Sequence, residues 1–439
     1  MITIFTPCQK IYVMPHLIFF FMVEKEVKNV ERIEKHVISK QNINFNSCNS
    51  ICFRSKNLYN YCNYILRQSF IHIGKLPNEY DLVKKLRARN NNVYFDLFGN
   101  VNQQCIKLLY KNWKSFFASI KDYGKNKSKY LGRPKLPKYK DKDGRNIAIF
   151  TYMDCRIKDG FLHFNKNANL QPIKTLVQEG SLCQVRIVPQ TGCYIIEIVY
   201  KFQPVNTDLC TDNYLSIDLG IDNFATCYDS HANKAFIING KIIKSINQFY
   251  NKQKAMLMSF IKNKGTSNRI KQLELKRKNK IEDYMHKASK DIIVYCITNN
   301  IGTIVIGHNK EWKQNSNIGK CNNQKFVQIP FNNFIQKIQY KCENVGINCI
   351  ITEESYTSKV DHSVLEKMTH QENYIGKRIQ RGLFEQSSGK VLNADLNGAI
   401  GILRKVINES DFNQIIDRGF VINPVRVNPL TKDFIKILY

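Results

Sequence analysis

The spacing of hydrophobic positions changes along the chain and predicts where helices and strands lie. Over residues 55–123 apolar residues recur every three or four positions, the periodicity of amphipathic helices. Over residues 147–202 runs such as VRIVPQTGCYIIEIVYKF alternate, which predicts antiparallel strands with a turn at residues 190–192. VERIEKHVISK, within residues 23–50, also alternates and suits a strand or a short helix. We therefore predict a helical segment inserted between β-segments.

After a polar linker at residues 204–213, strands and helices alternate. YLSIDLGIDNFATCYDS predicts an antiparallel hairpin with a Gly turn, and residues 267–300 predict one or two helices. GTIVIG predicts a short buried strand, and a helix is expected from near Pro330 to Gly346. The strand CIIT follows it. NADLNGAIGILRK predicts a final helix.

The composition indicates a globular, strongly basic protein. The 439 residues suffice for two or three domains, and 43% are hydrophobic and 11% aromatic. Lys and Arg number 66 against 36 Asp and Glu, a formal charge of +30. Nucleic acid is the usual partner of such a surface, and a membrane surface is the weaker alternative. The 14 Cys include no C-x-x-C pair, which favours a reduced chain and does not indicate zinc.

The apolar run IYVMPHLIFFFMV near the N-terminus is too short to span a bilayer and contains Pro15. No small-residue cleavage pattern follows it, as a signal peptide would require. We expect Met22 to be the working start, with residues 1–21 a mis-called extension, and we expect the segment 1–22 as a whole to be non-native or disordered. A short ordered strand is the alternative.

A basic segment lies between the helical and the β-regions. Residues 121–145 hold ten Lys or Arg and three Asp, interleaved with Tyr and interrupted by Gly and Pro. Phosphate contacts combined with base stacking use these residue types, and a solvated basic linker is the alternative. The candidate nucleic-acid-binding residues here are Lys129, Tyr130, Arg133, Lys135 and Lys138.

Three acidic positions are candidates for chemistry. Asp218 lies within an apolar strand, Glu353 or Glu354 follows the strand CIIT, and Asp395 opens the final helix. A carboxylate in an apolar strand is costly unless a cation compensates it. Three such groups would hold Mg²⁺ through oxygen ligands, and two ions could position water for attack on a phosphodiester. The alternatives are a turn cap, a surface strand end and a helix-start residue.

This order of carboxylates, first-strand Asp, mid-domain Glu and last-helix Asp, is that of an RNase H-like nuclease. LSIDLGIDNFAT, IGTIVIGHNKEWKQ, EESYTSK and LNADLNGAIGILRK, with the upstream GRPKLPKYKDKDGRN, resemble the TnpB proteins of bacterial insertion sequences. These are related to type V CRISPR effectors and Fanzor proteins. The resemblance extends from about Glu24 onward. It implies an RNA-guided, Mg²⁺-dependent DNA endonuclease.

The resemblance implies an α+β multidomain fold, with an N-terminal β-barrel that carries a helical insertion and a C-terminal RNase H-like (RuvC) α/β nuclease domain. The barrel would comprise residues 23–54 and, with the basic linker, 124–205. The helical recognition insertion would be 55–123. The nuclease domain would be 212–439, with 355–394 replacing a zinc ribbon.

One departure from the family pattern concerns the second carboxylate. Most TnpB proteins carry it at the end of the strand that here reads IVIGHNK, where Gly307 stands. EESYTSK follows what we expect to be the neighbouring strand, from which a Glu could reach the same metal pair. The expected ligands of two Mg²⁺ ions are therefore Asp218, Glu354 and Asp395, with Glu353 as the alternative to Glu354.

The second departure is the missing zinc ribbon. No Cys occurs from Ser355 to the C-terminus, so no zinc is expected. The sequence instead suggests a hairpin that turns near residues 387–389. Its candidate phosphate-binding residues are Lys377, Arg378 and Arg381. We expect His362 and His370 to be surface residues rather than ligands.

The resemblance also implies partners: a guide RNA from the end of the element itself, and double-stranded DNA with a short adjacent motif that the protein reads. A membrane partner is not expected, and the implied location is the bacterial cytoplasm, with the nucleoid. Two other functions remain open. One is a nuclease-inactive RNA-guided DNA-binding protein, which Gly307 favours. The other is a transposase or resolvase-like enzyme that joins DNA ends.

Overall fold

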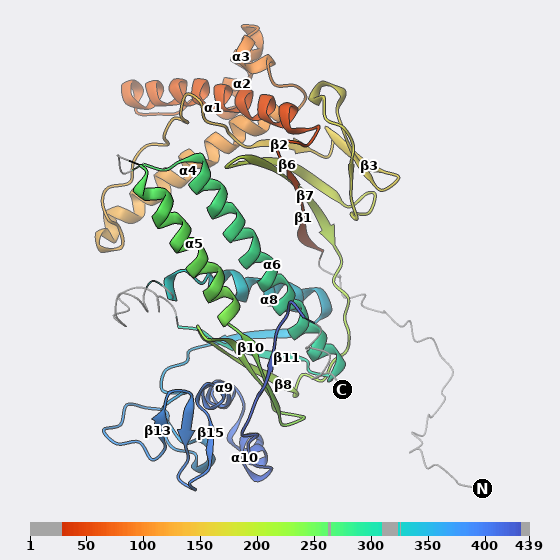
Figure 1. The fold of residues 1–439 in the computed structure, drawn as a ribbon. Coiled ribbons are helices and arrows are strands. Elements are labelled where there is room, and N and C mark those ends of the chain that lie inside the picture. The colour runs from red at the N-terminus through yellow and green to blue at the C-terminus, as the bar shows by residue number, and fades with distance from the viewer. Residues whose placement is uncertain (1–28, 262–264, 310–323, 325, 432–439) are drawn as a thin grey trace, which may run out of the picture.

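The computed structural model describes residues 29–261, 265–309, 324 and 326–431, so the extension predicted for residues 1–22 lies outside the described residues. Figure 1 shows an N-terminal part, red to yellow, and a C-terminal part, green to blue. Residues 203–213 connect the two. None of the helices within the described ranges is long and apolar enough to cross a membrane.

Four antiparallel strands form the main N-terminal sheet, in the order β1-β7-β6-β2. The strands are β1 (Val30–Ile38), β2 (Ala148–Thr151), β6 (Leu182–Gln190) and β7 (Cys193–Phe202). The tight turn between β6 and β7 lies where the sequence predicts it. In β6 and β7 alternate residues are buried, since one face of the sheet packs on helices.

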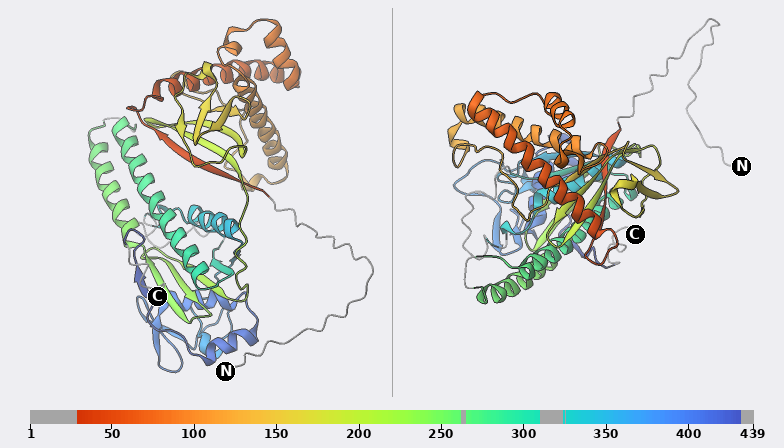
Figure 2. Two further views of the ribbon diagram at one scale, coloured as in Figure 1. Left: turned by 90° about the vertical axis from the view of Figure 1, so that its right-hand side faces the viewer. Right: turned by 90° about the horizontal axis from the view of Figure 1, so that it is seen from above.

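The helical insertion contains four helices: α1 (Phe45–Ile73), α2 (Glu79–Ala88), α3 (Asn92–Phe95) and α4 (Val101–Lys125). The first begins ten residues before the predicted start. α1 and α4 pack together and cover the sheet, as Figure 2 shows from two further directions. The indole of Trp113 is fully buried between them and donates to Asn63 Oδ1 at 3.1 Å.

The predicted N-terminal barrel is not confirmed. A second small sheet contains β3 (Cys155–Lys158), β4 (Phe161–Phe164) and β5 (Ile173–Lys174), in that order. Within the described residues, the outer strands β1 and β2 do not pair with each other, so the main sheet stays open. β2 has only four residues, and it packs against α4. A helix therefore lies against one edge strand of the open sheet.

The C-terminal sheet has six strands in the order β12-β11-β8-β9-β10-β16. The strands are β8 (Tyr214–Leu219), β9 (Asn223–Asp229), β10 (Lys234–Asn239), β11 (Thr303–Gly307), β12 (Asn348–Thr352) and β16 (Val425–Val427). β8, β9 and β10 are antiparallel, whereas β8, β11 and β12 run parallel. A separate three-stranded sheet contains β13 (Lys377–Gln380), β14 (Leu383–Glu385) and β15 (Val391–Asn393).

Helices cover both faces of the six-stranded sheet. One face packs on α6 (Asn268–Thr298) and α8 (Phe331–Val345), next to which lies α5 (Lys241–Ser259). The other packs on α9 (Ala394–Arg404) and α10 (Glu409–Asp417). Because side chains alternate along a strand, Leu215, Ile217 and Leu219 of β8 enter the α6 and α8 core, and Asp218 faces α9. α5 is a helix that the sequence pattern did not predict.

The two parts meet at the C-terminal end of α8. The side chain of Arg32, from β1, donates to Tyr340 O at 3.2 Å and to Asn344 Oδ1 at 2.7 Å. Val205 N donates to Asn344 O at 2.9 Å. The last carbonyls of a helix lack donors within the helix, so the linker and β1 supply them here.

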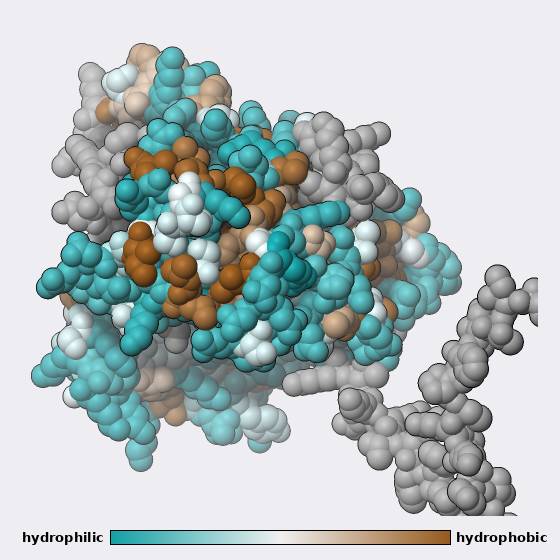
Figure 3. All heavy atoms as spheres, turned by 90° about the horizontal axis from the view of Figure 1, so that it is seen from below, coloured by the Kyte–Doolittle hydropathy of each residue, from teal (hydrophilic) through white to brown (hydrophobic). Residues whose placement is uncertain are grey.

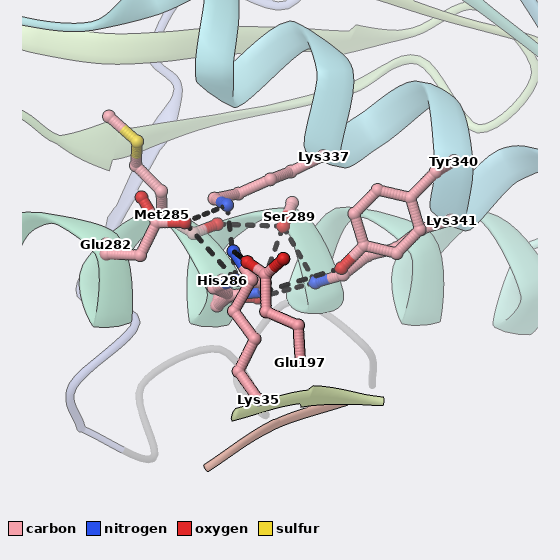
Figure 4. Close-up of polar contacts among 9 residues, drawn as sticks. All are labelled: Lys35, Glu197, Glu282, Met285, His286, Ser289, Lys337, Tyr340 and Lys341. Carbon is pink, nitrogen blue, oxygen red and sulfur yellow. Dashed lines mark hydrogen bonds and ion pairs between the residues drawn. The ribbon is translucent and has the colours of Figure 1, made fainter. Parts of the chain in front are cut away.

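Polar contacts also join α6 to α8 (Figure 4). Lys337 Nζ lies 2.5 Å from Glu282 Oε1 and 3.2 Å from His286 Nε2. Lys341 Nζ donates to the His286 carbonyl and to Ser289 Oγ, both at 2.7 Å. His286 and Lys337 together lower the pKa of Glu282 to about 2.

Seen from the end that carries α10, the surface is mostly hydrophilic (Figure 3). Hydrophobic side chains gather there in a limited area rather than over the whole face. This agrees with a chain whose Lys and Arg greatly outnumber its acidic residues.

The pairing of Glu282 with Lys337 predicts a pH-dependent stability difference. The folded pKa of Glu282 lies below its ordinary 4.5, so its contribution is present above that value and is lost as the pH falls toward 2. Lys337→Met should lower the thermal midpoint by a few degrees at neutral pH, and the difference from wild type should shrink on acidification. Lys287→Met, which breaks an exposed pair with Asp283, is the control. A difference that stays constant with pH would contradict this account.

Candidate functional site

Parallel strands bring two of the predicted carboxylates to one edge of the sheet. Asp218 is near the C-terminal end of β8, and Glu354 is the second residue after β12. β8, β11 and β12 are parallel neighbours, so their C-terminal ends lie together. Such ends are where open α/β sheets place their ligand sites. Asp395 comes from the other direction, in the first turn of α9.

Two glycines allow α9 to lie directly against these strands. A Cβ on Gly398 would be 2.8 Å from Asp218 Oδ2, so only glycine fits there without displacing the carboxylate. A Cβ on Gly307, the last residue of β11, would overlap Ile402 of α9 and lie 3.1 Å from Glu354 Oε2. Asp218 and Glu354 therefore lie on the side of the sheet that α9 covers.

The structure places Glu353 and Glu354 differently. Glu354 is partly buried, and its Oε2 occupies the space beside Gly307. Glu353 is exposed and accepts a hydrogen bond from Ser355 Oγ. The preceding strand, β12, is the edge strand of the sheet, and Ile351 is 43% exposed. As predicted, β12 pairs with the strand that ends at Gly307.

Burial raises the pKa of two of the carboxylates, Asp218 and Glu354, and the pKa of Asp218 is raised further by its acidic neighbours. Burial, then Asp395 and Glu354, raise the pKa of Asp218 well above its ordinary value. Burial raises the pKa of Glu354 to about 7. Within the described part of the chain, no Lys, Arg or His forms an ion pair with Asp218 or Glu354. Uncompensated oxygen donors of this kind fit a hard divalent cation such as Mg²⁺.

Asp218, Glu354 and Asp395 are neighbours, but they are not close enough together to form a complete set of metal ligands. Across the described residues, no three His, Cys, Asp or Glu side chains lie close enough together to hold a metal ion. The twelve cysteines in these ranges are free thiols, most of them buried.

Asp395 is the most strongly engaged of the three. Its Oδ2 accepts from Asn223 Nδ2 at 2.5 Å, and its Oδ1 lies 3.7 Å from Arg378 Nη2. Arg381 pairs with Asp222, in the turn between β8 and β9. Two arginines that the sequence assigned to phosphate contacts therefore lie on the rim of the carboxylate site. The third candidate of that hairpin, Lys377, pairs with Glu385 at 3.4 Å.

The expectation that His362 is a surface residue is wrong. His362 is fully buried, and its Nε2 donates to Thr357 O at 2.8 Å while Nδ1 accepts from Arg404 Nη1 at 3.4 Å. Burial lowers its pKa to about 4, so the ring is neutral at pH 7. Gly401 leaves room for the ring against α9. His362 thus anchors the loop that follows Glu354, whereas His370 is exposed.

The basic segment has a defined course along α1. Residues 134–142, named here the basic strap, are held by asparagine side chains of that helix. Asn60 exchanges two hydrogen bonds with the Lys140 backbone, at 2.8 and 2.9 Å. Asn63 Nδ2 donates to Pro137 O at 3.0 Å. The strap is therefore a fixed platform with exposed lysine side chains and not a loose linker.

The strap and the helices border an open pocket of about 400 Å³. The residues around it supply aromatic rings, ammonium groups and small polar groups, and they include Tyr59, Asn112, Phe116, Lys135, Lys138, Tyr139 and Lys140. Two of the candidates, Lys135 and Lys138, line it. Lys129 and Arg133 are exposed nearby in sequence, and Tyr130 donates to Asp122 at 2.8 Å. Tyr59 and Asn112 were not among the predicted nucleic-acid-binding residues.

Two family profiles match the C-terminal half. The profile described as probable transposase (OrfB_IS605) matches residues 197–313. The profile of the Cas12f1-like TNB domain matches residues 331–402. Over these residues the chain is similar to TnpB-like proteins. No curated protein matches the sequence.

Solved structures similar to this chain are distant in sequence. A Cas12f1–sgRNA–target DNA complex is 15% identical, with 81% of each chain covered and a TM-score of 0.49. A CRISPR–Cas12f ternary complex is 13% identical over 82% of this chain and 81% of that one, with a TM-score of 0.36. The mini RNA-guided endonuclease Cas_phi3 is 10% identical over 91% and 94%, with a TM-score of 0.44. Because these identities and TM-scores are low, the similarity to TnpB-like proteins rests on the two family profiles.

The packing at Gly307 predicts the effect of adding one methyl group. Gly307→Ala should lower the free energy of unfolding by about 1–3 kcal/mol, because the new Cβ overlaps Ile402 and crowds Glu354. Adding Ile402→Val should restore part of the loss, since it removes the overlapping methyl. Gly124→Ala, in open space on α4, is the control. Urea unfolding measures all three, and a Gly307→Ala as harmless as the control would refute this packing.

Proposed function

We propose that this protein is an RNA-guided, Mg²⁺-dependent DNA endonuclease that hydrolyses phosphodiesters. The observation that carries the proposal is the convergence of Asp218, Glu354 and Asp395 from three separate elements on one edge of the sheet. The order of these residues along the chain is that of RNase H-like nucleases. The three antiparallel strands followed by two parallel ones also support an RNase H-like (RuvC) domain over residues 212–439.

Each carboxylate has a distinct place in the proposed site. Asp218 would be the central ligand, because burial and both neighbours raise the free energy of its anionic form until a cation binds. Glu354 would take the position that Gly307 leaves open, and Asp395 would close the site from α9. When bound, two Mg²⁺ ions supply an activated water and stabilise the leaving oxygen. No protein nucleophile is required.

The nucleic-acid partners would contact basic surfaces in both parts of the protein. The basic strap presents lysines from a backbone that hydrogen bonds hold to α1. Arg378 and Arg381 are at the edge of the carboxylate site, where phosphates of a bound strand would pass. Similarity to TnpB-like proteins supports a guide RNA as one partner and target DNA as the other.

The domain boundaries are part of this proposal. Residues 23–54 and 124–205 would form the nucleic-acid-binding β-region around the helical insertion 55–123. Residues 355–394 would replace the zinc ribbon, and their strands β13, β14 and β15 build a small sheet in which Phe384 is buried. Burial of Phe384 would thereby stabilise this segment, as a bound zinc ion would stabilise a zinc ribbon.

A guided DNA-binding protein without cleavage is the second candidate. It is favoured by the lack, over the described ranges, of three acidic or His side chains close enough to hold an ion. The description "probable transposase" keeps an enzyme that joins DNA ends as the third. An enzyme that only cuts needs no donor ends, whereas one that joins them does.

Cleavage of a plasmid library by protein purified with its flanking RNA, in Mg²⁺, tests the proposal. Glu354→Ala should reduce the cleavage rate by at least about 100-fold, beyond the loss typical of outer-shell groups, since it removes a direct ligand. Asp218→Asn and Asp395→Asn should behave alike. Glu353→Ala is the matched control and should cut within about threefold of wild type.

The same assay separates the candidates. Wild type that binds a matched target but never cuts would make the chain a guided binder. Loss of cleavage in Glu353→Ala, with Glu354→Ala active, would reverse the assignment of the two glutamates. Product formation only when donor ends are present would indicate DNA joining.

The basic strap predicts a salt-dependent binding loss. Replacing Lys135, Lys138 and Lys140 with Ala should weaken nucleic-acid binding and reduce the slope of log K against log salt by about 3, roughly one per phosphate contact. Lys158, Lys166 and Lys174, near the small sheet, are the matched control. Filter binding from low to high salt measures both. An unchanged slope would exclude the strap as a phosphate-contacting surface.

A further inference from the structure

Asp395 is held by a residue that lies 172 positions earlier in the chain. Asn223, the first residue of β9, donates from Nδ2 to Asp395 Oδ2 at 2.5 Å. Arg378 approaches the other oxygen only to 3.7 Å, and its side chain is 54% exposed. Asn223 is therefore the closer of the two partners and fixes the orientation of the carboxylate.

A second contact sets the orientation of the Asn223 amide. Arg426 Nη2, from β16, donates to Asn223 Oδ1 at 2.8 Å. A guanidinium cannot accept a hydrogen bond and a carboxylate cannot donate one, so only one orientation of the amide satisfies both neighbours. The three side chains form a chain of donors that runs from Arg426 through Asn223 to Asp395.

The backbone around this chain of donors is fixed. β16 pairs in parallel with β10, with Arg426 opposite Ile237. Val427 is buried in the core, so the strand holds the arginine in place while its guanidinium reaches outward. In the turn before Asn223, Asp222 accepts from Lys244 and from Arg381. Asn223 thus has little freedom to turn away from Asp395.

We propose that Asn223 is a positioning residue for Asp395 and that Arg426 acts through it. This inference rests on the proposed role of Asp395 as a ligand of a divalent cation. A ligand whose hydrogen-bonded partner holds it in place loses less conformational freedom when it binds an ion. The affinity of the site for the ion then depends on β16, a strand that contributes none of the three carboxylates.

Direct measurement of ion binding tests the inference independently of cleavage. The full chain with its guide RNA is titrated with Mn²⁺, and free Mn²⁺ is followed by electron paramagnetic resonance. Asn223→Ala should raise the dissociation constant for Mn²⁺ by about 10–100-fold, the usual cost of losing a group that orients a ligand. The Mg²⁺ concentration for half-maximal cleavage should rise in parallel, and target DNA binding should stay within about twofold.

The Arg426 variants test the direction of the chain of donors. Arg426→Ala should weaken Mn²⁺ binding less than Asn223→Ala, and Arg426→Lys should recover most of the loss because an ammonium also donates to Oδ1. The double variant should match Asn223→Ala alone, since Arg426 acts only through Asn223. Additive losses in the double variant would overturn the inference.

Matched controls separate positioning from general destabilisation. Asn251→Ala removes an α5 amide that pairs with Gln328, away from the carboxylates. Arg418→Ala removes an exposed arginine that caps the carbonyls of Ser230 and His231. Both should bind Mn²⁺ as wild type does. Because Arg426 is exposed, its variants are expected to fold. They therefore test the positioning role even if Asn223→Ala does not fold.

Two outcomes separate this inference from the proposed function. Wild type that neither binds Mn²⁺ nor cuts would overturn the function, and the inference with it. Wild type that does both, with Asn223→Ala binding Mn²⁺ within twofold of it, would overturn the positioning role alone.

Discussion

The close approach of α9 to the sheet is the constraint on which the site depends. Gly398 lets the helix lie against Asp218, and Gly401 leaves space for His362. A side chain at either position would move the helix outward, and Asp395 with it. Interiors are packed too tightly to absorb such a shift without loss elsewhere. The lack of a side chain at these two positions therefore allows α9 to pack against β8, the first strand of the sheet.

The distribution of charge follows from that contact. The chain has a formal charge of +30, yet acidic side chains gather where α9 meets the sheet. Lys and Arg side chains lie around them, but within the described residues none forms an ion pair with Asp218 or Glu354. Lys244, Arg381 and Arg426 hold the turn at 220–223 from three different elements. The cations thus stabilise the backbone beside the carboxylates and leave Asp218 and Glu354 available. A positive surface with a negative centre is suited to drawing a polyanion toward bound cations.

Local patterns in the sequence predicted much of this arrangement. The helix from Pro330 ends at Gly346 with φ of 77°, because only that residue adopts a left-handed conformation at no cost. The strand and helix that carry Asp218 and Asp395 also lie where predicted. What escaped prediction is non-local. The burial of His362 and the bond between Asn223 and Asp395 depend on residues far apart in the chain, and the open N-terminal sheet depends on how α1 and α4 cover it.

The location of Glu354 has a consequence for the stability of the site relative to that of the fold. β12 has a neighbour on one side only, and the loop after it is held by side-chain hydrogen bonds, among them that of buried His362 to Thr357 O. Edge elements of this kind open in local fluctuations that leave the central strands intact. Asp218 belongs to the central part of the sheet and Glu354 to its margin. The central strands can therefore stay folded while Glu354 moves away from Asp218, so the geometry of the proposed site would be less stable than the fold around it.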